Sequence, residues 1–451
     1  MRSITSFVCQ ECGYDSAQWL GKCPECGMWN SLKEFKVQSF PRSGISLRET
    51  KFKAGSKTEN IKPKTLAEIR YDSKDRISTG FSEFDNVLGG GLVRGSVVLV
   101  AGDPGVGKST LLLQLALNLA SISFQKILYI SGEESAEQIK LRASRIYKNY
   151  NDIKNILILS STDTDLVLAT IEKIKPNLVI VDSIQTMESE GLAGLSGSIG
   201  QVRYGTSCFI KTAKTLNIPI FIVGHVTKEG MVAGPMVLSH MVDSVLFLEG
   251  EKITNTRILR SLKNRFGPVD EVGVFTMEEE GIKEANSPEQ LFLTKNLPKN
   301  LTGSIISVTM EGSRAFLVEI QGLVVSSKIP IPRRVSSGID YKRLELLLAV
   351  LQKHCNLPLS GMDVFINVAG GLRLSDPAAD LGICLAIFSS FKNISLSNIV
   401  AISEVGLLGE LRPVQFVEKR VKEAQKLGFK KIISHSNTYK TLNEVIRALS
   451  R

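Results

Sequence analysis

The chain has 451 residues and a formal net charge of +10, with 43% hydrophobic and 22% charged residues. This length predicts two or three domains, and the composition is that of a globular protein. The longest apolar runs, such as 96–101 and 218–224, are strand-length. A membrane-spanning helix needs roughly 20 apolar residues, so we expect no membrane span.

The N-terminus lacks the charged-then-apolar layout of a secretory signal. The seven cysteines show no disulfide framework, which agrees with a reducing compartment. We therefore expect a cytoplasmic protein. The net positive charge fits either a polyanionic partner such as nucleic acid or simply a basic proteome.

Residues 1–35 contain two C-x2-C pairs separated by ten residues, formed by Cys9, Cys12, Cys23 and Cys26. Four thiolates at this spacing can complete one tetrahedral, structural Zn²⁺ site. A redox role is the alternative, and the presence of two pairs disfavours it. Trp19 and Trp29 flank the second pair and form either an exposed docking surface or the small core of the module.

A polar, basic stretch at 36–75 has the composition of a linker. From 76 to 285 apolar strand-like runs alternate with amphipathic stretches, which predicts an α/β domain with a mostly parallel sheet and helices on both faces. The expected strands are 97–102, 126–132, 155–160, 177–183 and 219–225. A second α/β region is expected over 286–451, with strands near 304–312, 315–324, 363–371, 399–407 and 430–436 and helices near 341–354, 377–390 and 416–427.

The segment 102–110, "GDPGVGKST", fits the P-loop pattern G-x-x-x-x-G-K-[ST] directly after a strand and before a helix. Its backbone N–H groups and helix start suit phosphate oxygens, Lys108 should reach the β and γ phosphates of ATP, and Ser109 should ligate Mg²⁺. The predicted nucleotide-binding residues are Gly102, Asp103, Pro104, Gly105, Val106, Gly107, Lys108, Ser109 and Thr110.

Three further strands end in polar residues at the same edge of the predicted sheet. Asp182 is expected to hold Mg²⁺ through its water shell, and Glu133 to polarise the attacking water, with Glu134 as the competing choice. His225 would sense the γ phosphate or be a satisfied buried histidine.

The run 79–114, together with the cysteine pairs, the "KNRFG" segment at 263–267 and the C-terminal region, resembles the RadA (Sms) family of bacterial DNA repair proteins, whose core is of the RecA type. The resemblance covers essentially the whole chain. It implies a DNA-dependent ATPase of the helicase type that translocates on single-stranded DNA and processes branched recombination intermediates. It also implies a homo-oligomeric ring, a hexamer, and the RecA recombinase as a partner.

Lys263 and Arg265 lie two apart on a strand-like segment, so they should point to one face. The resemblance implies that they stabilise the transferred phosphoryl group of a neighbouring subunit, or couple nucleotide to bound DNA. The alternative is a solvated basic turn.

Segments 366–387 and 401–437 resemble the proteolytic domain of the Lon family. A Lon-type protease needs a serine and a lysine. Here Ala378 takes the serine position and Glu418 the lysine position, with Lys419 one residue away and no base matched to the nearby Ser375. We therefore expect a non-proteolytic scaffold. Candidate phosphate contacts on it are Arg314, Arg333, Arg334, Lys342, Arg343 and Arg373.

Two other functions stay open at this point. An ATP-dependent protease would need the missing serine. A RecA-fold nucleotide switch would bind protein partners rather than DNA, and its ATPase would ignore added single-stranded DNA.

Overall fold

The structure is a computed structural model. It describes residues 4–9, 15–16, 18–24, 27–37, 65, 68, 76–122, 126–192, 194–225, 238–250, 255–285, 292–294, 301–396, 398–436 and 438–450. Most of the predicted linker lies outside this part of the chain. The chain divides into two compact units, one made of Met1–Glu249, Leu259–Val269 and Met277–Ile282, the other of Gly250–Ile258, Asp270–Thr276 and Lys283–Arg451.

The N-terminal module is a small antiparallel sheet in the order β2-β1-β3, with β1 at Ile4–Cys9, β2 at Asp15–Ser16 and β3 at Leu32–Val37. Cys9 and Cys23 are buried and pack with Leu32. So few apolar residues bury too little surface to hold a fold of this size, which is why a metal is expected to contribute.

The first unit contains most of a nine-stranded sheet in the order β12-β11-β10-β9-β4-β8-β7-β5-β6. The strands from β9 to β6 in this order are parallel. Their bounds are β4 Val97–Gly102, β5 Ile127–Ser131, β6 Ile156–Ser160, β7 Leu178–Asp182, β8 Ile220–His225 and β9 Ser244–Glu249. The remaining strands are β10 Thr256–Asn264, β11 Val272–Glu278 and β12 Gly281–Glu284.

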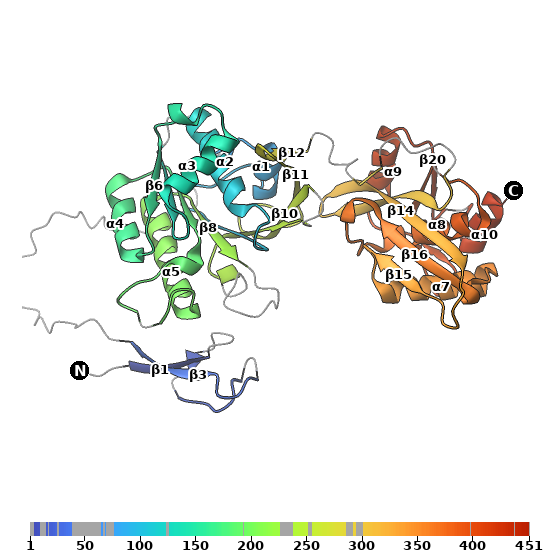
Figure 1. The fold of residues 1–451 in the computed structure, drawn as a ribbon, viewed down its shortest axis with the longest axis horizontal. Helices are drawn as coiled ribbons and strands as arrows, with labels where there is room; N and C mark the ends of the chain where they lie inside the picture. Colours follow the sequence, from blue (N-terminus) through green and yellow to red (C-terminus); the bar gives the residue numbers. More distant parts are fainter. Residues whose placement is uncertain are drawn as a thin grey trace, which may run out of the picture. The chain divides into compact units, whose positions relative to one another are not determined.

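Helices cover both faces of this sheet, as Figure 1 shows. They are α1 Ser82–Leu88, α2 Lys108–Ile122, α3 Ala136–Ile146, α4 Thr164–Ile174 and α5 Ile199–Leu216, with short 3₁₀ turns at Tyr150–Asp152 and Ile184–Thr186. Strands β4, β5 and β7 are buried along their whole length, which is why they read as continuous apolar runs rather than as alternating patterns.

The five strands predicted for this region from the sequence are all present. Because parallel strands end at one edge, Gly102, Asp182 and His225 are brought together at the carboxyl ends of β4, β7 and β8. This edge is where the P-loop, Asp182 and His225 of the predicted nucleotide site meet.

The second unit is built on a six-stranded sheet in the order β15-β16-β14-β13-β17-β20. Its strands are β13 Ser304–Glu311, β14 Arg314–Ser326, β15 Arg334–Ser337, β16 Met362–Val368, β17 Ile399–Ile402 and β20 Lys431–Ser434, and β18 Glu404–Val405 pairs with β19 Leu411–Arg412. Its helices are α7 Tyr341–Cys355, α8 Asp380–Lys392, α9 Val417–Lys426 and α10 Leu442–Leu449, and 3₁₀ turns lie at Leu359–Gly361, Ala369–Gly371 and Pro377–Ala379.

The two faces of this second sheet are covered by different helices. Ile305 belongs to the core that includes α7, α8 and α10, while the next residue, Ile306, belongs to the core beneath α9. This alternation is expected for a strand buried on both sides. The predicted strand at 399–407 is divided into β17 and β18, and the sequence did not predict α10. Among the described residues, no helix is long and apolar enough to span a bilayer.

Candidate active site

The loop between β4 and α2 needs glycine at two positions. Gly102 has φ of 153°, and a Cβ there would lie 2.3 Å from the carbonyl oxygen of Leu248 on the adjacent β9. Gly107 has φ of 112°, and a Cβ there would lie 2.5 Å from the Met277 Cε. The backbone conformation favours glycine at both positions, and at Gly102 the contact with the Leu248 backbone also excludes a Cβ, so the tight loop at the start of α2 depends on these glycines.

Lys108 begins α2, and its side chain is buried against the loop it follows. Its Nζ donates to the carbonyl oxygens of Gly102 at 2.8 Å and Asp103 at 3.0 Å. Burial lowers the pKa of Lys108, and the carboxylates of Asp182, Asp103 and Glu133 oppose that shift. These two carbonyl oxygens hold the Lys108 ammonium beside the loop. In a nucleotide complex, a phosphate oxygen would replace them as the acceptor of its hydrogen bonds.

Asp182 ends β7 and is buried, with 7% of its surface exposed. The hydroxyl of Tyr129, on the neighbouring β5, donates to its Oδ2 at 2.5 Å. Burial raises the pKa of Tyr129 well above its usual range, so the phenol keeps its proton. Sequence reasoning missed Tyr129, because only the pairing of β5 with β7 brings it to this carboxylate.

Mg²⁺ fits the donors at this edge. The metal prefers oxygen ligands and keeps several of its own waters. Asp182 offers a carboxylate of which one oxygen is taken by Tyr129, and Ser109 offers a half-buried hydroxyl on the first turn of α2. These are the two side chains that would hold the ion.

Glu133 and Glu134 follow β5 and have different partners. The Ser183 hydroxyl donates to the Glu133 Oε1 at 2.7 Å, and the Nε2 of His225 lies 3.5 Å from the same oxygen. Glu134 instead forms an ion pair with Arg142 of α3, and its N–H donates to the Ser131 hydroxyl. The structure therefore places Glu133, rather than Glu134, beside Ser183, which follows β7, and His225, which ends β8.

His225 is half-buried at the end of β8. Burial and then the nearby Lys108 ammonium lower its pKa, while Glu133 and Asp182 act in the opposite direction. The imidazole is therefore neutral at pH 7 and can donate or accept one hydrogen bond at this edge.

Lys263 and Arg265 both contact the segment 239–243 of their own chain. The Lys263 Nζ donates to the carbonyl oxygens of Ser239 at 2.6 Å and Val242 at 2.8 Å. Arg265 lies 3.3 Å from the Asp243 carboxylate, which also receives Lys214 at 2.7 Å. Among the described residues, these two cations contact the segment 239–243 rather than the P-loop. This segment follows residues 226–237, which lie outside the described part of the chain.

The rest of the "KNRFG" segment is anchored to the end of α1. The Asn264 amide donates to the carbonyl oxygen of Leu88 at 3.1 Å, and Arg76 donates to that of Phe266 at 2.5 Å. Gly267 packs directly on Gly89, since a Cβ on either would lie 2.9 Å from the other's Cα. The turn is therefore a fixed element of the first unit.

The zinc ligands are described in part. Cys9 and Cys23 are buried in one small cluster, and the Cys9 thiol lies 3.2 Å from the Ser31 hydroxyl. Cys12 and Cys26 lie outside the described residues. Trp19 donates through its indole N–H to the carbonyl oxygen of Leu32 at 3.1 Å, but 53% of its surface stays exposed, as does 70% of that of Trp29.

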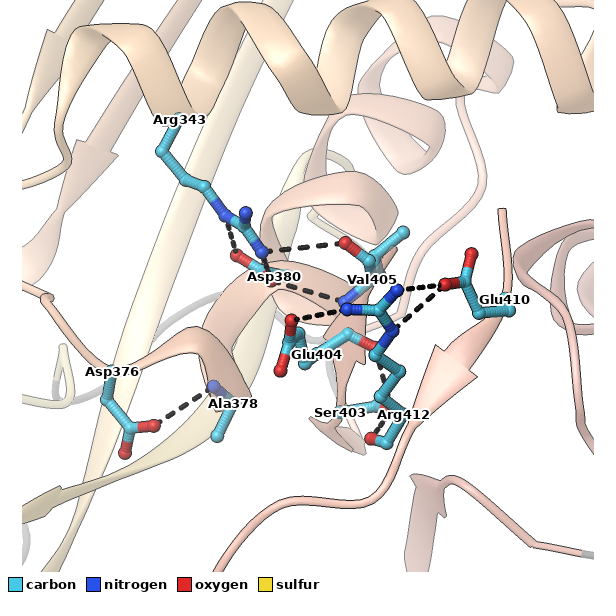
Figure 2. Close-up of polar contacts among 9 residues, drawn as sticks. All are labelled: Arg343, Asp376, Ala378, Asp380, Ser403, Glu404, Val405, Glu410 and Arg412. Atoms are coloured by element: carbon cyan, nitrogen blue, oxygen red, sulfur yellow. Dashed lines mark hydrogen bonds and ion pairs between the residues drawn. The ribbon is translucent and has the colours of Figure 1, made fainter. Parts of the chain in front are cut away.

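In the second unit, Ala378, predicted from the sequence to align with the serine of a Lon-type protease, offers only a buried methyl group. Ala378 lies in the turn before α8, and its N–H donates to Asp376 at 3.0 Å, as Figure 2 shows. Asp376 is paired at 2.6 Å with Arg420, a buried residue of α9 that also donates to the carbonyl oxygen of Val308. Lys419 donates to the backbone of Ser313. The buried cation paired with Asp376 is therefore an arginine, which stays protonated and cannot act as a base.

Arg343 and Asp380 form a two-contact ion pair across the start of α8 (Figure 2). Burial raises the pKa of Asp380, and Arg343 opposes the shift. Arg334 is similarly used, donating to the carbonyl oxygen of Leu359 at 2.8 Å. The side chains of Arg334 and Arg343 are thus engaged in contacts within the second unit. Of the other candidates, Arg333, Lys342 and Arg373 are exposed.

Comparisons with known proteins match three parts of the chain to family models. Residues 63–231 match a family described as AAA domain, residues 7–34 match Rubredoxin metal binding domain, and residues 343–437 match Subunit ChlI of Mg-chelatase. DNA repair protein RadA of Bacillus subtilis is 46% identical over 433 residues, covering 96% of this chain and 92% of that protein. DNA repair protein RadA of Halalkalibacterium halodurans is 45% identical over 430 residues, covering 95% of this chain and 92% of that protein.

The chain belongs to the RadA family. Family membership confirms the resemblance predicted from the sequence, and with it a RecA-like DNA repair ATPase of α/β fold with an N-terminal zinc ribbon. A crystal structure of the RadB recombinase matches 46% of this chain and 99% of its own at 24% identity and a TM-score of 0.37, a likeness too weak to carry an argument. The RadA relatives imply ATP as the nucleotide and the metal-binding module implies zinc.

Proposed function

We propose that this chain is a cytoplasmic, DNA-dependent ATPase that translocates on single-stranded DNA and processes branched recombination intermediates as a homo-hexameric ring, with the RecA recombinase as a partner. The observation that carries the proposal is the convergence of Lys108, Asp182, Glu133 and His225 at one sheet edge in a chain of the RadA family. The net charge of +10 supports a polyanionic partner.

In the proposed reaction, the loop amides and Lys108 bind the phosphates of ATP. Ser109 and Asp182 hold Mg²⁺, which neutralises negative charge on the phosphate oxygens when it is bound. Glu133, oriented by the Ser183 hydroxyl at 2.7 Å, accepts a proton from the attacking water. The Nε2 of neutral His225 lies 3.5 Å from the same oxygen of Glu133. His225 would therefore move when the γ phosphate is bound or released, and would pass that movement to the segment that follows β8.

Lys263 and Arg265 would serve the site of a neighbouring subunit and connect it to DNA. Their anchoring to segment 239–243 supports the coupling role, because a shift of this segment moves both cations together. The second unit would be a Lon-like, non-proteolytic scaffold, since Ala378 offers no nucleophile. The same residue argues against an ATP-dependent protease.

The test is the ATPase rate of the native chain and of Lys263→Ala measured against the concentration of single-stranded DNA. We expect DNA to stimulate the native chain and the variant to keep ATP binding while losing that stimulation. Lys173→Ala, an exposed lysine of α4, is the matched control and should behave as native. An ATPase that ignores DNA in the native chain would instead support a nucleotide switch that binds protein partners.

A further inference from the structure

The Tyr129 hydroxyl is a buried polar group that the mechanism above does not use. Tyr129 has 0% of its surface exposed, and its phenol donates to the Asp182 Oδ2 at 2.5 Å. A phenylalanine would fill the same space in the core of the sheet. The hydroxyl therefore has a role beyond packing.

Strand register explains how the two side chains meet. In the parallel pairing of β5 with β7, Tyr129 lies opposite Ile180 and Ser131 lies opposite Asp182. Side chains two residues apart share a face, so all four lie on one face of the sheet. The phenol thus runs along the sheet from the middle of β5 to the carboxyl end of β7.

We propose that Tyr129 is a positioning residue for the metal-binding carboxylate: its hydroxyl occupies the Oδ2 of Asp182 and fixes the carboxylate so that Oδ1 faces the nucleotide side. This inference rests on the proposed role of Asp182 as a holder of Mg²⁺. Among the described residues, none donates a hydrogen bond to the Oδ1, so it is the oxygen left for a metal-bound water.

The physical reason is the cost of a buried carboxylate. Asp182 has 7% of its surface exposed, so water cannot satisfy both of its oxygens. Without the phenol the carboxylate would turn toward other donors. One of these is the Lys108 ammonium, which already interacts electrostatically with Asp182. One strong donor on Oδ2 removes that freedom, and a hydrogen bond to a charged acceptor is among the stronger ones in proteins.

The test removes one oxygen atom. Tyr129→Phe and, as a matched control, Tyr204→Phe on α5 are compared by titrating the binding of a fluorescent ATP analogue with Mg²⁺. We expect nucleotide affinity without Mg²⁺ to stay within about 2-fold for both variants. The Mg²⁺ concentration for half-maximal effect should rise about 10- to 150-fold in Tyr129→Phe alone, the range expected for a lost hydrogen bond to a charged group.

Two further variants separate this inference from the proposed function. If Asp182→Asn leaves the Mg²⁺ dependence unchanged, the assignment of Asp182 fails. If Asp182→Asn raises the Mg²⁺ requirement but Tyr129→Phe does not, the positioning role alone is overturned. In the double variant we expect Tyr129→Phe to add nothing to Asp182→Asn, because the tyrosine acts through the carboxylate.

Folding of the variant is itself informative. Should Tyr129→Phe fail to fold, the proposal predicts that Asp182→Asn restores folding, because a neutral amide is less costly to bury without its donor than a carboxylate. Thermal unfolding of the single and double variants would show this. A double variant as unfolded as Tyr129→Phe would overturn the proposal.

Discussion

Glu133 and Glu134 show how much the surroundings decide the role of a residue. They are consecutive and chemically identical, yet Glu133 faces Ser183 and His225 while Glu134 is paired with Arg142. A pattern that ends in two acidic residues cannot say which one faces the nucleotide. The helix capping by Ser135 and the Arg142 ion pair decide it, and both depend on the position of α3.

We expect Glu133→Gln to lower the ATPase rate by about 10²- to 10⁴-fold, the usual contribution of a general base, with ATP affinity unchanged within about 3-fold. Glu134→Gln should lose less than about 10-fold of activity and instead lower the melting temperature, because it breaks the ion pair with Arg142. Rates under saturating ATP and nucleotide binding measure the two effects. The reverse order of activity would show that Glu134 is the base.

His225 gives the site a pH dependence of known sign. Burial and Lys108 lower its pKa in the folded chain, so the unfolded chain takes up the proton first as pH falls through about 6.5. The stability that neutral His225 contributes is therefore complete above that pH and is lost as the pH falls toward the lowered folded pKa.

We therefore expect the melting temperatures of the native chain and His225→Gln to differ more at pH 7.5 than at pH 5.5. His435→Gln, which alters an exposed histidine, is the control. A gap for His225→Gln that widens toward low pH would contradict the lowered pKa.

At the scale of elements, the sequence predicted the parts whose signal is local. The strands of the first unit are continuous apolar runs, and the P-loop has a fixed spacing of glycine, lysine and serine. The positions of both therefore follow from a few neighbouring residues. Contacts between distant residues could not be predicted in this way. Asp243 forms ion pairs with Lys214 and Arg265. It also accepts a hydrogen bond from the N–H of Val97, which lies 146 residues away in the sequence.

The division of the predicted strand at 399–407 has a similar cause. Asp380 accepts the N–H of Val405 at 3.2 Å, so the backbone leaves the sheet after β17 to meet the buried carboxylate. No local pattern reveals that Arg343 and Asp380 need this N–H as a third partner. The amphipathic α10, by contrast, could have been predicted, because its capping box at Thr441 and Glu444 is a local signal that the sequence shows.

The "KNRFG" turn should depend on a close contact between backbones. A Cβ on Gly267 would lie 2.9 Å from the Gly89 Cα and 3.2 Å from the Leu88 carbonyl oxygen. We expect Gly267→Ala to destabilise the first unit by about 1–3 kcal/mol, because the Gly89 and Leu88 contacts are backbone atoms that cannot turn aside as the nearby Asn264 side chain could.

Displacing this turn should also reduce the stimulation of ATPase by DNA, while nucleotide binding remains. Gly191→Ala is the matched control, since its Cβ would meet only the Ser189 hydroxyl at 3.7 Å. Thermal unfolding and DNA titrations of both variants measure the two effects. Equal stability of the two variants would show that the turn is not held by this contact.

For the whole molecule, the central question is whether the cations of one copy act on the nucleotide of another. Within the chain Arg265 is paired with Asp243, yet 55% of its side chain is exposed. Lys214 lies closer to the same carboxylate, at 2.7 Å, so Asp243 keeps a counterion when Arg265 moves away. The intrachain ion pair is therefore inexpensive to break, as exposed ion pairs generally are.

Mixing two inactive variants tests action between copies. Lys108→Ala lacks a working P-loop but keeps Arg265, and Arg265→Ala keeps the P-loop but lacks the cation. In a ring that mixes them equally, half of the subunits keep the P-loop and half of their neighbours keep the cation, so we expect about one quarter of the native ATPase rate. Lys108→Ala mixed with the double variant Lys108→Ala/Arg265→Ala is the control and should stay inactive, because no subunit then keeps a P-loop. An Arg265 that served only its own chain would leave the first mixture no more active than its components, and the ring mechanism would have to be given up.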